Sequence, residues 1–232
     1  MLDTAQGRVF VKGLRRDEAR CGTQEMEAAV APFVAEFSPR CLLRLAENGW
    51  DLLVFEAVEG RHASYAPGSH DLPLLIETMK KLGSVPAPDL PLKRAEHRWK
   101  PYLTEPRHAP LLAGDALLHT DYAPDNVIIS DGRAILIDWA WPTKGARWVD
   151  PACLVLRLMA DGHSAAQAEE VVSPLPAWSD APSEALAAFA LASVKLWGEI
   201  AGRDQSSWTK AMELAALEWA AHRRSRVRDG GR

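Results

Sequence analysis

Residues 117–142 read LLHTDYAPDNVIISDGRAILIDWAWP, and this stretch decides the fold. An apolar run ends at His119, a polar loop follows, and strand-like residues resume at Val127. Asp131-Gly132 predicts a two-residue hairpin turn, because both central residues of a type I′ turn need a positive φ. The expected order is therefore loop, strand, tight turn and strand.

The predicted hairpin brings three polar side chains together. With a two-residue turn, Asn126 pairs with Ile137, so Asn126 and Asp138 lie at the same end of the hairpin. Asp121 lies in the loop that leads into this end. Two carboxylates and an amide oxygen are hard ligands of the kind that Mg²⁺ prefers when it binds phosphate groups. The stretch therefore predicts magnesium-dependent phosphate chemistry.

The spacing of His119, Asp121 and Asn126 matches H-x-D-x-x-x-x-N, the kinase catalytic loop. Asp138 stands where the metal-binding aspartate follows the hairpin, and Trp139 comes next, where protein kinases have Phe-Gly. This segment resembles the aminoglycoside phosphotransferase family, which has the protein-kinase-like fold. The resemblance implies that Asp121 is the catalytic base and that Asn126 and Asp138 hold Mg²⁺. We expect His119 to pack and hydrogen-bond within the loop rather than to act as a proton shuttle.

Residues 8–12 read RVFVK, a short β-branched strand that Gly13 is expected to end. If this is the third strand of a kinase-like small lobe, the resemblance makes Lys12 the lysine that grips the α- and β-phosphates of ATP. The alternative is an ordinary solvent-facing lysine on a strand.

A helix is expected downstream of this strand, with Thr23 as its N-cap and Pro32 as its limit. In the resembling family a helix glutamate orients the lysine, and both Glu25 and Glu27 are close enough in the sequence. We prefer Glu27 because an apolar helix face follows it. Glu25 is expected to be a solvated residue of the first turn.

Asn48-Gly49 predicts a second hairpin, between strands at residues 41–45 and 50–55. The second of these strands leads into Glu56–Gly60, which the resemblance makes the hinge between two lobes. The backbone groups of Glu56 and Val58 are then expected to pair with the adenine edge of ATP. The alternative is a plain strand end and loop.

The fold class expected from these features is α+β, with a protein-kinase-like two-lobed fold. Residues 1–58 would form a small β-rich N-lobe and residues 59–232 a larger, mostly helical C-lobe. The N-lobe is expected to be incomplete, because only one strand fits into Met1 to Gln6 and no phosphate-covering loop precedes Lys12. Either the true start lies further upstream, or the chain is a shortened relative with an open ATP site.

Helices are expected from residue 70 or 71 to 82, at 93–103 and 151–159, from a cap at Ser164 to 172, from 182 or 183 to 201, and from 206 or 207 to 224. Asp150 is expected to cap the third of these helices. In the resembling family this Asp-Pro motif also supports the catalytic loop. For the last helix, Leu214, Leu217 and Ala221 are expected on the buried face.

Composition is ordinary for a soluble globular protein, with 47% hydrophobic and 25% charged residues. Neither a secretory leader nor a membrane-spanning run is readable, and three cysteines without metal spacing fit a reducing cytoplasm. The net charge is −4, and a mildly acidic body is compatible with a cationic substrate. The arginine-rich residues 223–232 are expected to be a solvated end rather than a nucleic-acid site.

The function expected is ATP-dependent transfer of the γ-phosphoryl group to a hydroxyl of a small molecule. Family members act on aminoglycosides, macrolides, choline, homoserine or ketosamines, and the sequence does not specify the acceptor. The incomplete N-lobe motivates one alternative, a non-catalytic nucleotide-binding or regulatory module. A metal-dependent hydrolase that uses the same carboxylates is a third possibility.

Overall fold

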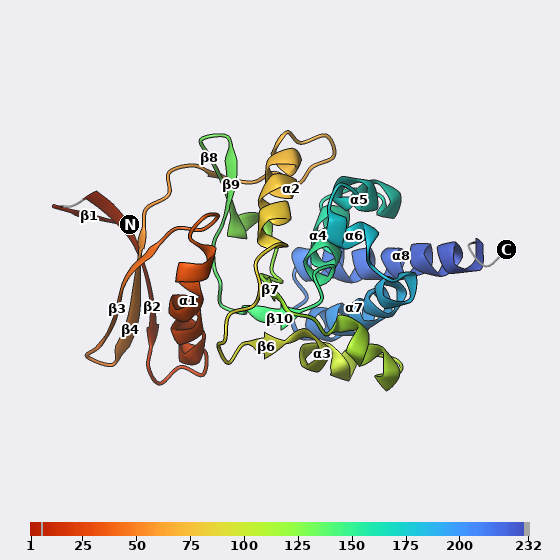
Figure 1. Ribbon diagram of the computed structural model, residues 1–232, viewed down its shortest axis with the longest axis horizontal. Coiled ribbons are helices and arrows are strands. Elements are labelled where there is room, and N and C mark those ends of the chain that lie inside the picture. The colour runs from red at the N-terminus through yellow and green to blue at the C-terminus, as the bar shows by residue number, and fades with distance from the viewer. Residues whose placement is uncertain (6, 230–232) are drawn as a thin grey trace.

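The computed structural model describes residues 1–5 and 7–229, with side chains described as far as residue 226. The N-terminal part is a four-stranded antiparallel sheet in the order β1-β2-β4-β3, with helix α1 against it (Figure 1). Its elements are β1 (Leu2–Thr4), β2 (Gly7–Arg15), α1 (Cys21–Val34), β3 (Cys41–Glu47) and β4 (Trp50–Glu56). Side chains alternate in burial along β4, because successive residues of a strand point to opposite faces. The buried face is the one that α1 covers.

The hairpin between β3 and β4 is formed as predicted, with Asn48 at φ 51° and Gly49 at φ 82°. One smaller expectation for this region is wrong, and another is not tested. Gly13 does not end the strand but pairs with Leu52, and a Cβ there would lie 2.7 Å from the Leu52 side chain, so glycine allows the close approach. Gln6, at the end of the predicted first strand, lies outside the described residues.

Helix α1 begins earlier and ends later than predicted. Thr23 is inside the helix, and its hydroxyl donates to the carbonyl of Arg20, so it is not the N-cap. Pro32 lies in the last turn, and the helix continues to Val34. A proline there removes one backbone hydrogen bond without preventing the final residues from remaining helical.

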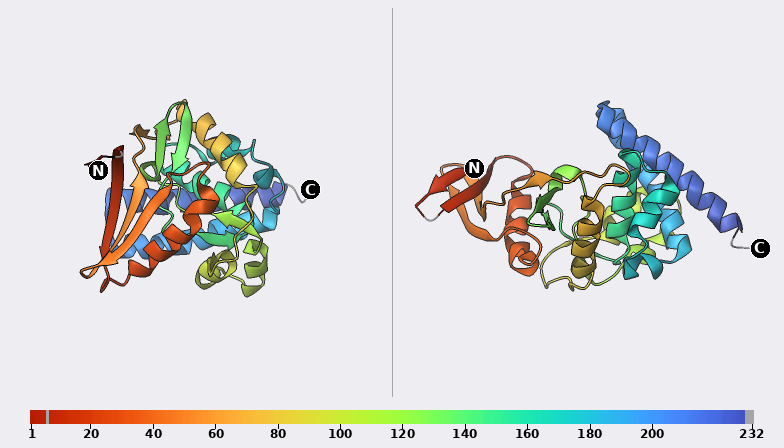
Figure 2. Two further views of the ribbon diagram at one scale, coloured as in Figure 1. Left: turned by 60° about the vertical axis from the view of Figure 1, so that its left-hand side comes forward. Right: turned by 90° about the horizontal axis from the view of Figure 1, so that it is seen from above.

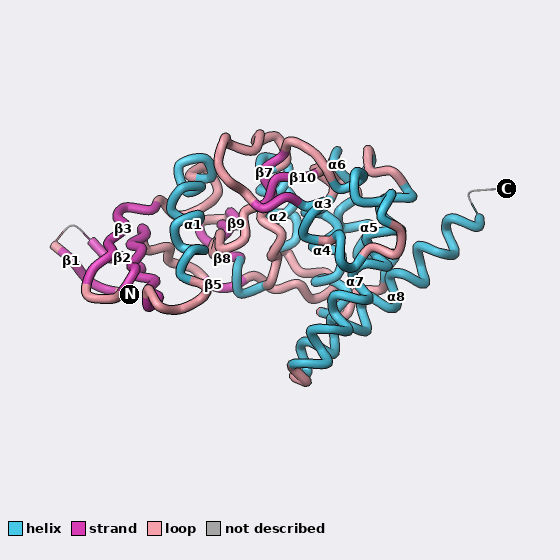
Figure 3. Tube along the Cα trace, turned by 90° about the horizontal axis from the view of Figure 1, so that it is seen from below, coloured by secondary structure: helices cyan, strands magenta, loops and turns pink. Residues whose placement is uncertain are grey.

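The second part of the chain is mostly helical and carries two small sheets, ordered β5-β8-β9 and β6-β10-β7. Figures 2 and 3 show the N-terminal sheet at one end of the molecule and helices α4 to α8 at the other. The elements are β5 (Arg61–His62), α2 (Asp71–Leu82), β6 (Lys93–Arg94), α3 (Ala95–Arg98), η1 (Lys100–Tyr102), η2 (Pro106–Leu112), β7 (Ala116–Leu118), η3 (Pro124–Asn126), β8 (Val127–Ser130), β9 (Arg133–Leu136), β10 (Thr143–Gly145), α4 (Val149–Ala160), α5 (Ala165–Val172), α6 (Pro176–Ser179), α7 (Ser183–Arg203) and α8 (Ser207–Asp229). The molecule is therefore an α+β protein with a small antiparallel sheet region followed by a helical region.

The single helix expected over residues 93–103 is not formed. Lys93 and Arg94 instead pair in parallel with Thr143 and Lys144 of β10, and only short helical turns follow. Strand pairing across about 50 residues of chain outweighs the local helical pattern, which no sequence window can reveal.

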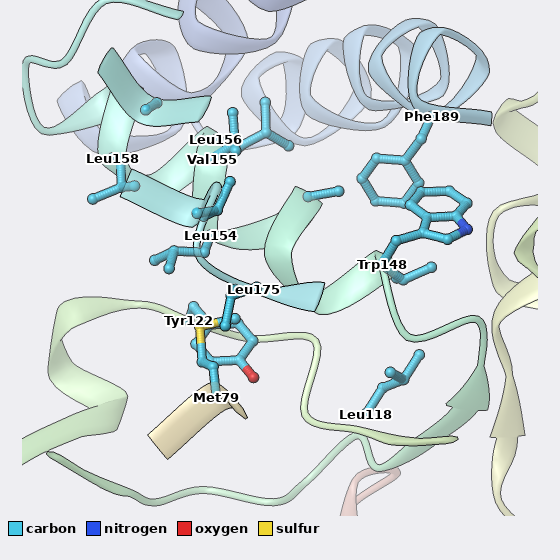
Figure 4. Close-up of a cluster of buried hydrophobic side chains, with 14 of the residues drawn as sticks. Met79, Leu118, Tyr122, Trp148, Leu154, Val155, Leu156, Leu158, Leu175 and Phe189 are labelled. Atoms are coloured by element: carbon cyan, nitrogen blue, oxygen red, sulfur yellow. The ribbon is translucent and has the colours of Figure 1, made fainter. Parts of the chain in front are cut away.

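The core of the second part is built on α4, α7 and α8. Figure 4 shows Phe189 of α7 against Trp148, and their ring centroids are 5.6 Å apart in an edge-to-face arrangement. Phe189 also contacts Trp219 of α8, which is fully buried. By length and hydropathy α7 could cross a membrane, but it packs here as a core helix against α8, so its apolar character is weak evidence for a span.

Helix α8 buries a different face from the one predicted. Leu214 and Leu217 are 56% and 49% exposed, whereas Ala215, Ala216 and Trp219 are buried. A shift of one residue moves side chains by 100° around a helix, and the large ring of Trp219 sets the phase by packing on Phe189.

The basic C-terminal tail is not a frayed end as far as the described residues reach. Arg223 is buried and lies 2.7 Å from Glu169, and Arg226 lies 2.9 Å from the same carboxylate. Helix α8 continues to Asp229, and Arg232 lies outside the described residues. Part of the tail's positive charge is therefore used to attach α8 to α5.

Candidate active site

The hairpin of β8 and β9 has the register and turn that the sequence predicts. Val127 pairs with Leu136, and Asp131 and Gly132 form the turn with φ values of 48° and 70°. Beyond the last pair, the amide of Ile137 donates to the carbonyl of Asn126 at 2.9 Å. Asn126 therefore lies beside the backbone that immediately precedes Asp138.

His119 ties the loop to this hairpin. Its Nε2 lies 2.9 Å from the carbonyl of Ile137, and its Nδ1 accepts a hydrogen bond from the amide of Asp121 at 3.2 Å. A neutral imidazole with its proton on Nε2 satisfies both contacts. The side chain is 2% exposed, so it holds Asp121 and the strand after β9 in a fixed relation.

Asp150 holds the same loop from the other side. Its carboxylate accepts hydrogen bonds from the amides of His119 and Thr120, at 3.0 and 2.9 Å, and from the Tyr122 hydroxyl at 2.9 Å. The prediction that Asp150 caps the following helix is wrong, because α4 already begins at Val149 and the carboxylate is turned to the loop. Burial raises the pKa of Asp150, and the hydrogen bonds act in the opposite direction.

The backbone is strained where this support acts. Thr120 and Asp138 both adopt positive φ, 68° and 62°. Side chains other than glycine rarely adopt this region, and the cost is largest for β-branched residues. The hydrogen bond that the Thr120 amide donates to Asp150 holds Thr120 in this conformation, which sets the direction of the adjacent Asp121.

Asp121 is half-exposed at the bottom of the loop. Its Oδ1 accepts a hydrogen bond from Nη2 of Arg157 at 2.7 Å, and its carbonyl accepts one from Nδ2 of Asn126 at 3.2 Å. None of the described residues donates to Oδ2, which leaves that oxygen for a ligand. Because Nδ2 of Asn126 is used in this hydrogen bond, Oδ1 of Asn126 is the side-chain atom that remains for a ligand.

Lys12 of β2 joins the sheet region to the hairpin. Its Nζ lies 2.7 Å from Oε2 of Glu27 in α1 and 2.6 Å from Oδ1 of Asp138. Glu27 is buried and Glu25 is exposed, so the structure pairs Lys12 with the preferred glutamate.

The protonation of this group follows from its surroundings. Burial lowers the pKa of Lys12, but Glu27 and Asp138 outweigh it and the net effect raises the pKa. Burial raises the pKa of Glu27, and the Lys12 ammonium opposes it. The attraction between Lys12 and Glu27 therefore opposes the desolvation of both charged groups.

A cleft of about 460 Å³ contains these groups. Its lining includes the residues predicted to bind the nucleotide and the metal, which are Lys12, Glu27, Glu56, Val58, Asn126 and Asp138. The amide of Glu56 donates to the carbonyl of Arg40, and the two side chains form an ion pair. The amide of Glu56 is therefore already used, and its carbonyl is the backbone group that could face a ligand, as a hinge residue would provide.

The donor set at this place suits Mg²⁺ bound with phosphates. Asn126 and Asp138 supply an amide oxygen and a carboxylate, and Mg²⁺ takes one or two protein oxygens, with phosphate and water oxygens completing its six ligands. In the part of the chain that the structure describes, no group of three His, Cys, Asp or Glu side chains could hold a metal by itself. The residues therefore fit a metal that arrives with a nucleotide.

Sequence reasoning missed Arg157 and a second hollow on the far side of Asp121. This hollow has a volume of about 540 Å³ and is formed by residues of α3, α4, α7 and α8. One signal could have found Arg157: it lies seven residues after Asp150, on the same face of α4. The other lining residues come from distant segments and share no readable spacing.

No protein-family model matches the chain, and no curated protein matches its sequence. Several solved structures share its fold. One is LicA in complex with AMP, at 16% identity over 94% of this chain and 86% of that chain, with a TM-score of 0.64. Another is a choline/ethanolamine kinase family protein from Mesorhizobium loti, at 17% identity over 94% and 82%, with a TM-score of 0.56.

A third is aminoglycoside phosphotransferase APH(3'')-Id from Streptomyces rimosus, in complex with ADP and streptomycin. It is 16% identical over 93% of this chain and 88% of that chain, with a TM-score of 0.53. Identities this low establish a shared fold and leave the substrate open. The chain therefore has the protein-kinase-like fold, which it shares with aminoglycoside phosphotransferases and with choline kinase-like proteins.

Proposed function

We propose that this protein is an ATP-dependent phosphotransferase that moves the γ-phosphoryl group to a hydroxyl of a small molecule. The observation that carries this proposal is the convergence of Asn126, Asp138 and the Lys12–Glu27 pair at one cleft, with Asp121 hydrogen-bonded to Asn126 through its carbonyl in the same loop. AMP and ADP in the complexes of two structural neighbours support a nucleotide as its ligand.

Each residue has a defined role in this reaction. Lys12, oriented by Glu27, contacts the α- and β-phosphates, and the carbonyl of Glu56 and the amide of Val58 bind the adenine edge. Asn126 and Asp138 hold Mg²⁺, which neutralises charge on the transferred phosphates. Asp121 orients the acceptor hydroxyl and accepts its proton. A loose transition state builds little charge on that oxygen until late, so Asp121 does not need a raised pKa.

The ion pair between Lys12 and Asp138 favours a second candidate, a nucleotide-binding module without catalysis. In the present arrangement Lys12 neutralises the carboxylate that would hold Mg²⁺. For catalysis, Lys12 has to exchange Asp138 for nucleotide phosphates when the metal binds. A protein that does not make this exchange would bind nucleotide and transfer nothing.

The test is product formation from ATP and a panel of hydroxylated small molecules, with Asp121→Asn beside the native protein. Phosphotransfer predicts product that falls about a hundredfold to ten-thousandfold in Asp121→Asn. Asp125→Asn is the matched control, because this carboxylate is exposed in the same loop and is expected to keep full turnover. Nucleotide binding without product from any acceptor would instead favour the non-catalytic module.

Phosphate release that does not depend on an acceptor would point to a hydrolase.

We further propose a cytoplasmic location, because ATP is available there and thiols stay reduced; the three cysteines are free.

A further inference from the structure

The second hollow opens on the catalytic loop, on the opposite side from the nucleotide cleft. Thr120 and Asp121 line it, whereas Asn126 and Asp138 line the cleft, so the loop separates the two spaces. Its volume of about 540 Å³ is large enough for a drug-sized molecule. A hydroxyl placed here can reach Oδ2 of Asp121, which is the position that an acceptor needs.

The charge of this hollow is positive. Three cations line it, namely Lys93, Arg98 and Arg157, against the single carboxylate of Asp121. Arg157 pairs with Asp121, and among the described residues no carboxylate forms an ion pair with Lys93 or Arg98. The hydrogen bonds of Arg98 go to neutral oxygens: the hydroxyls of Thr120 and Thr143, at 2.7 and 2.5 Å, and the carbonyl of Trp141 at 3.4 Å. Among the described residues, the charges of Lys93 and Arg98 therefore lack a carboxylate partner and lie against aromatic rings.

Arg157 has an unused donor in the same place. Its side chain is 10% exposed, and its Nη1 is buried without a hydrogen-bond partner among the described residues. A buried guanidinium N–H that lacks an acceptor is costly, and native proteins rarely leave one unpaired. Because Nη1 is buried behind the surface of the hollow, a ligand oxygen satisfies this donor only when the guanidinium turns toward the ligand.

The tryptophans of the hollow do not form a free cage for a cation. Arg157 already stacks on Trp197 and Trp208, at 5.4 and 4.9 Å from the ring centroids. Lys93 lies 4.4 Å from the centroid of Trp141. Because protein cations occupy these ring faces, a cationic ligand would meet repulsion in place of a cation–π contact. The rings still offer apolar surface to the body of a ligand.

We propose that the ligand of this hollow, which is the phosphoryl acceptor if the proposed function holds, carries an anionic group of the carboxylate or phosphate kind. The anionic group binds the guanidinium groups of Arg98 and Arg157, and the hydroxyl lies at Asp121. The mildly acidic whole chain is compatible with a cationic substrate, but the charge within the hollow points to the opposite sign.

In the reaction, the acceptor hydroxyl oxygen forms a bond to the γ-phosphorus, and the bond from that phosphorus to the bridging oxygen of ADP breaks. The hydroxyl proton passes to Asp121. The products are ADP and a phosphate monoester of the anionic acceptor.

The first test is calorimetric binding of matched probes in the absence of nucleotide. 4-(Hydroxymethyl)benzoate, 4-(hydroxymethyl)benzylamine and 1,4-benzenedimethanol share a ring and a primary alcohol and differ in charge. The benzoate is expected to bind about tenfold or more tightly than the other two. 4-(Hydroxymethyl)phenylphosphonate, compared with the benzoate, distinguishes a phosphate-like group from a carboxylate.

Variants test whether the arginine and lysine charges cause this preference. Arg98→Gln is expected to weaken benzoate binding about tenfold, and Arg98→Lys to restore part of it. Lys93→Gln is a second test that leaves the catalytic loop untouched, because the side chain of Lys93 contacts only the exposed ring of Trp141 among the interactions described. Arg107→Gln is the control, since this arginine is exposed and pairs with Glu105 away from the hollow.

Two kinds of binding result would overturn the proposal. One is benzylamine binding as tightly as the benzoate, or no saturable binding of either anion. The other is anion binding that neither Arg98→Gln nor Lys93→Gln weakens. Phosphorylation of a neutral or cationic acceptor alone would refute the anionic class and leave phosphotransfer intact. Charge-dependent anion binding without turnover of any acceptor would support the anionic class and count against the proposed function.

Discussion

Removing the carboxylate of Asp150 should damage both stability and turnover, although Asp150 lies outside both cavities of the active site. Asp150→Ala leaves three buried donors without an acceptor: the amides of His119 and Thr120 and the hydroxyl of Tyr122. Each such group costs about 1–3 kcal/mol. The low end applies here, because water can enter the space of the lost side chain.

Two further effects reduce the expected loss of unfolding free energy in Asp150→Ala. Burial raises the pKa of Asp150, so the ionised carboxyl is itself costly in the folded protein and its removal returns part of that cost. The strain at Thr120, about 1–3 kcal/mol for such a conformation, is relieved when the loop relaxes. We therefore expect the free energy of unfolding to fall by about 2–4 kcal/mol. Turnover should fall more than tenfold, because Asp121 follows Thr120 directly.

Denaturant unfolding and ATP turnover measure these two effects. Tyr122→Phe removes one of the three donors and should cost about 1 kcal/mol in the native protein and much less in Asp150→Ala. Asp89→Ala is the control, since this aspartate is exposed and none of the described residues bonds to its carboxylate. A loss of less than about 0.5 kcal/mol in Asp150→Ala, or strictly additive effects of the two substitutions, would refute the reasoning.

Three other outcomes are expected. In the folded state the pKa of Asp150 is raised, so the contribution of this carboxyl group to stability is complete below its ordinary pKa and is lost as pH rises through the pKa of the folded state. The difference in unfolding free energy between the native protein and Asp150→Asn, measured from about pH 4 to pH 7, should therefore shrink with rising pH. A difference that grows with pH would contradict this expectation. Phe189→Ala should cost about 3–5 kcal/mol in denaturant unfolding, because its ring is buried among three tryptophans, whereas Leu214→Ala on the exposed face should cost less than about 0.5; equal losses would show that the α8 face is wrong. Lys12→Met should weaken ATP binding about tenfold or more in a nucleotide titration, since it removes the charge expected to contact phosphates, and unchanged affinity would exclude Lys12 from the nucleotide site.

The central motif could be predicted because its geometry is local. A type I′ turn at Asp131-Gly132 sets the register of the hairpin, and the register alone places Asn126 beside the residue before Asp138. The Asn48-Gly49 turn was predictable for the same reason. Local backbone preferences act within a few residues, so these features do not depend on the rest of the fold.

The pairing of Lys12 with Glu27 required more than a local rule. The resemblance to kinases supplied the expectation of a strand lysine and a helix glutamate, and burial in the structure distinguishes Glu27 from Glu25. Sequence spacing alone left both open, although residues two apart on a helix differ by 200° in direction, and the preference for Glu27 came from the apolar residues that follow it.

By itself, the sequence determined the hairpin, the order of its polar residues and the α+β class, since each of these follows from turn chemistry and the period of apolar residues. Only the tertiary structure decided the acceptor side of the site: Arg98, Arg157, Trp197 and Trp208 lie on four different helices and meet through packing alone. The same holds for the buried face of α8 and for β6, whose partner β10 is about 50 residues away. Long-range packing depends on the shape and charge of surfaces that exist only once the chain has folded.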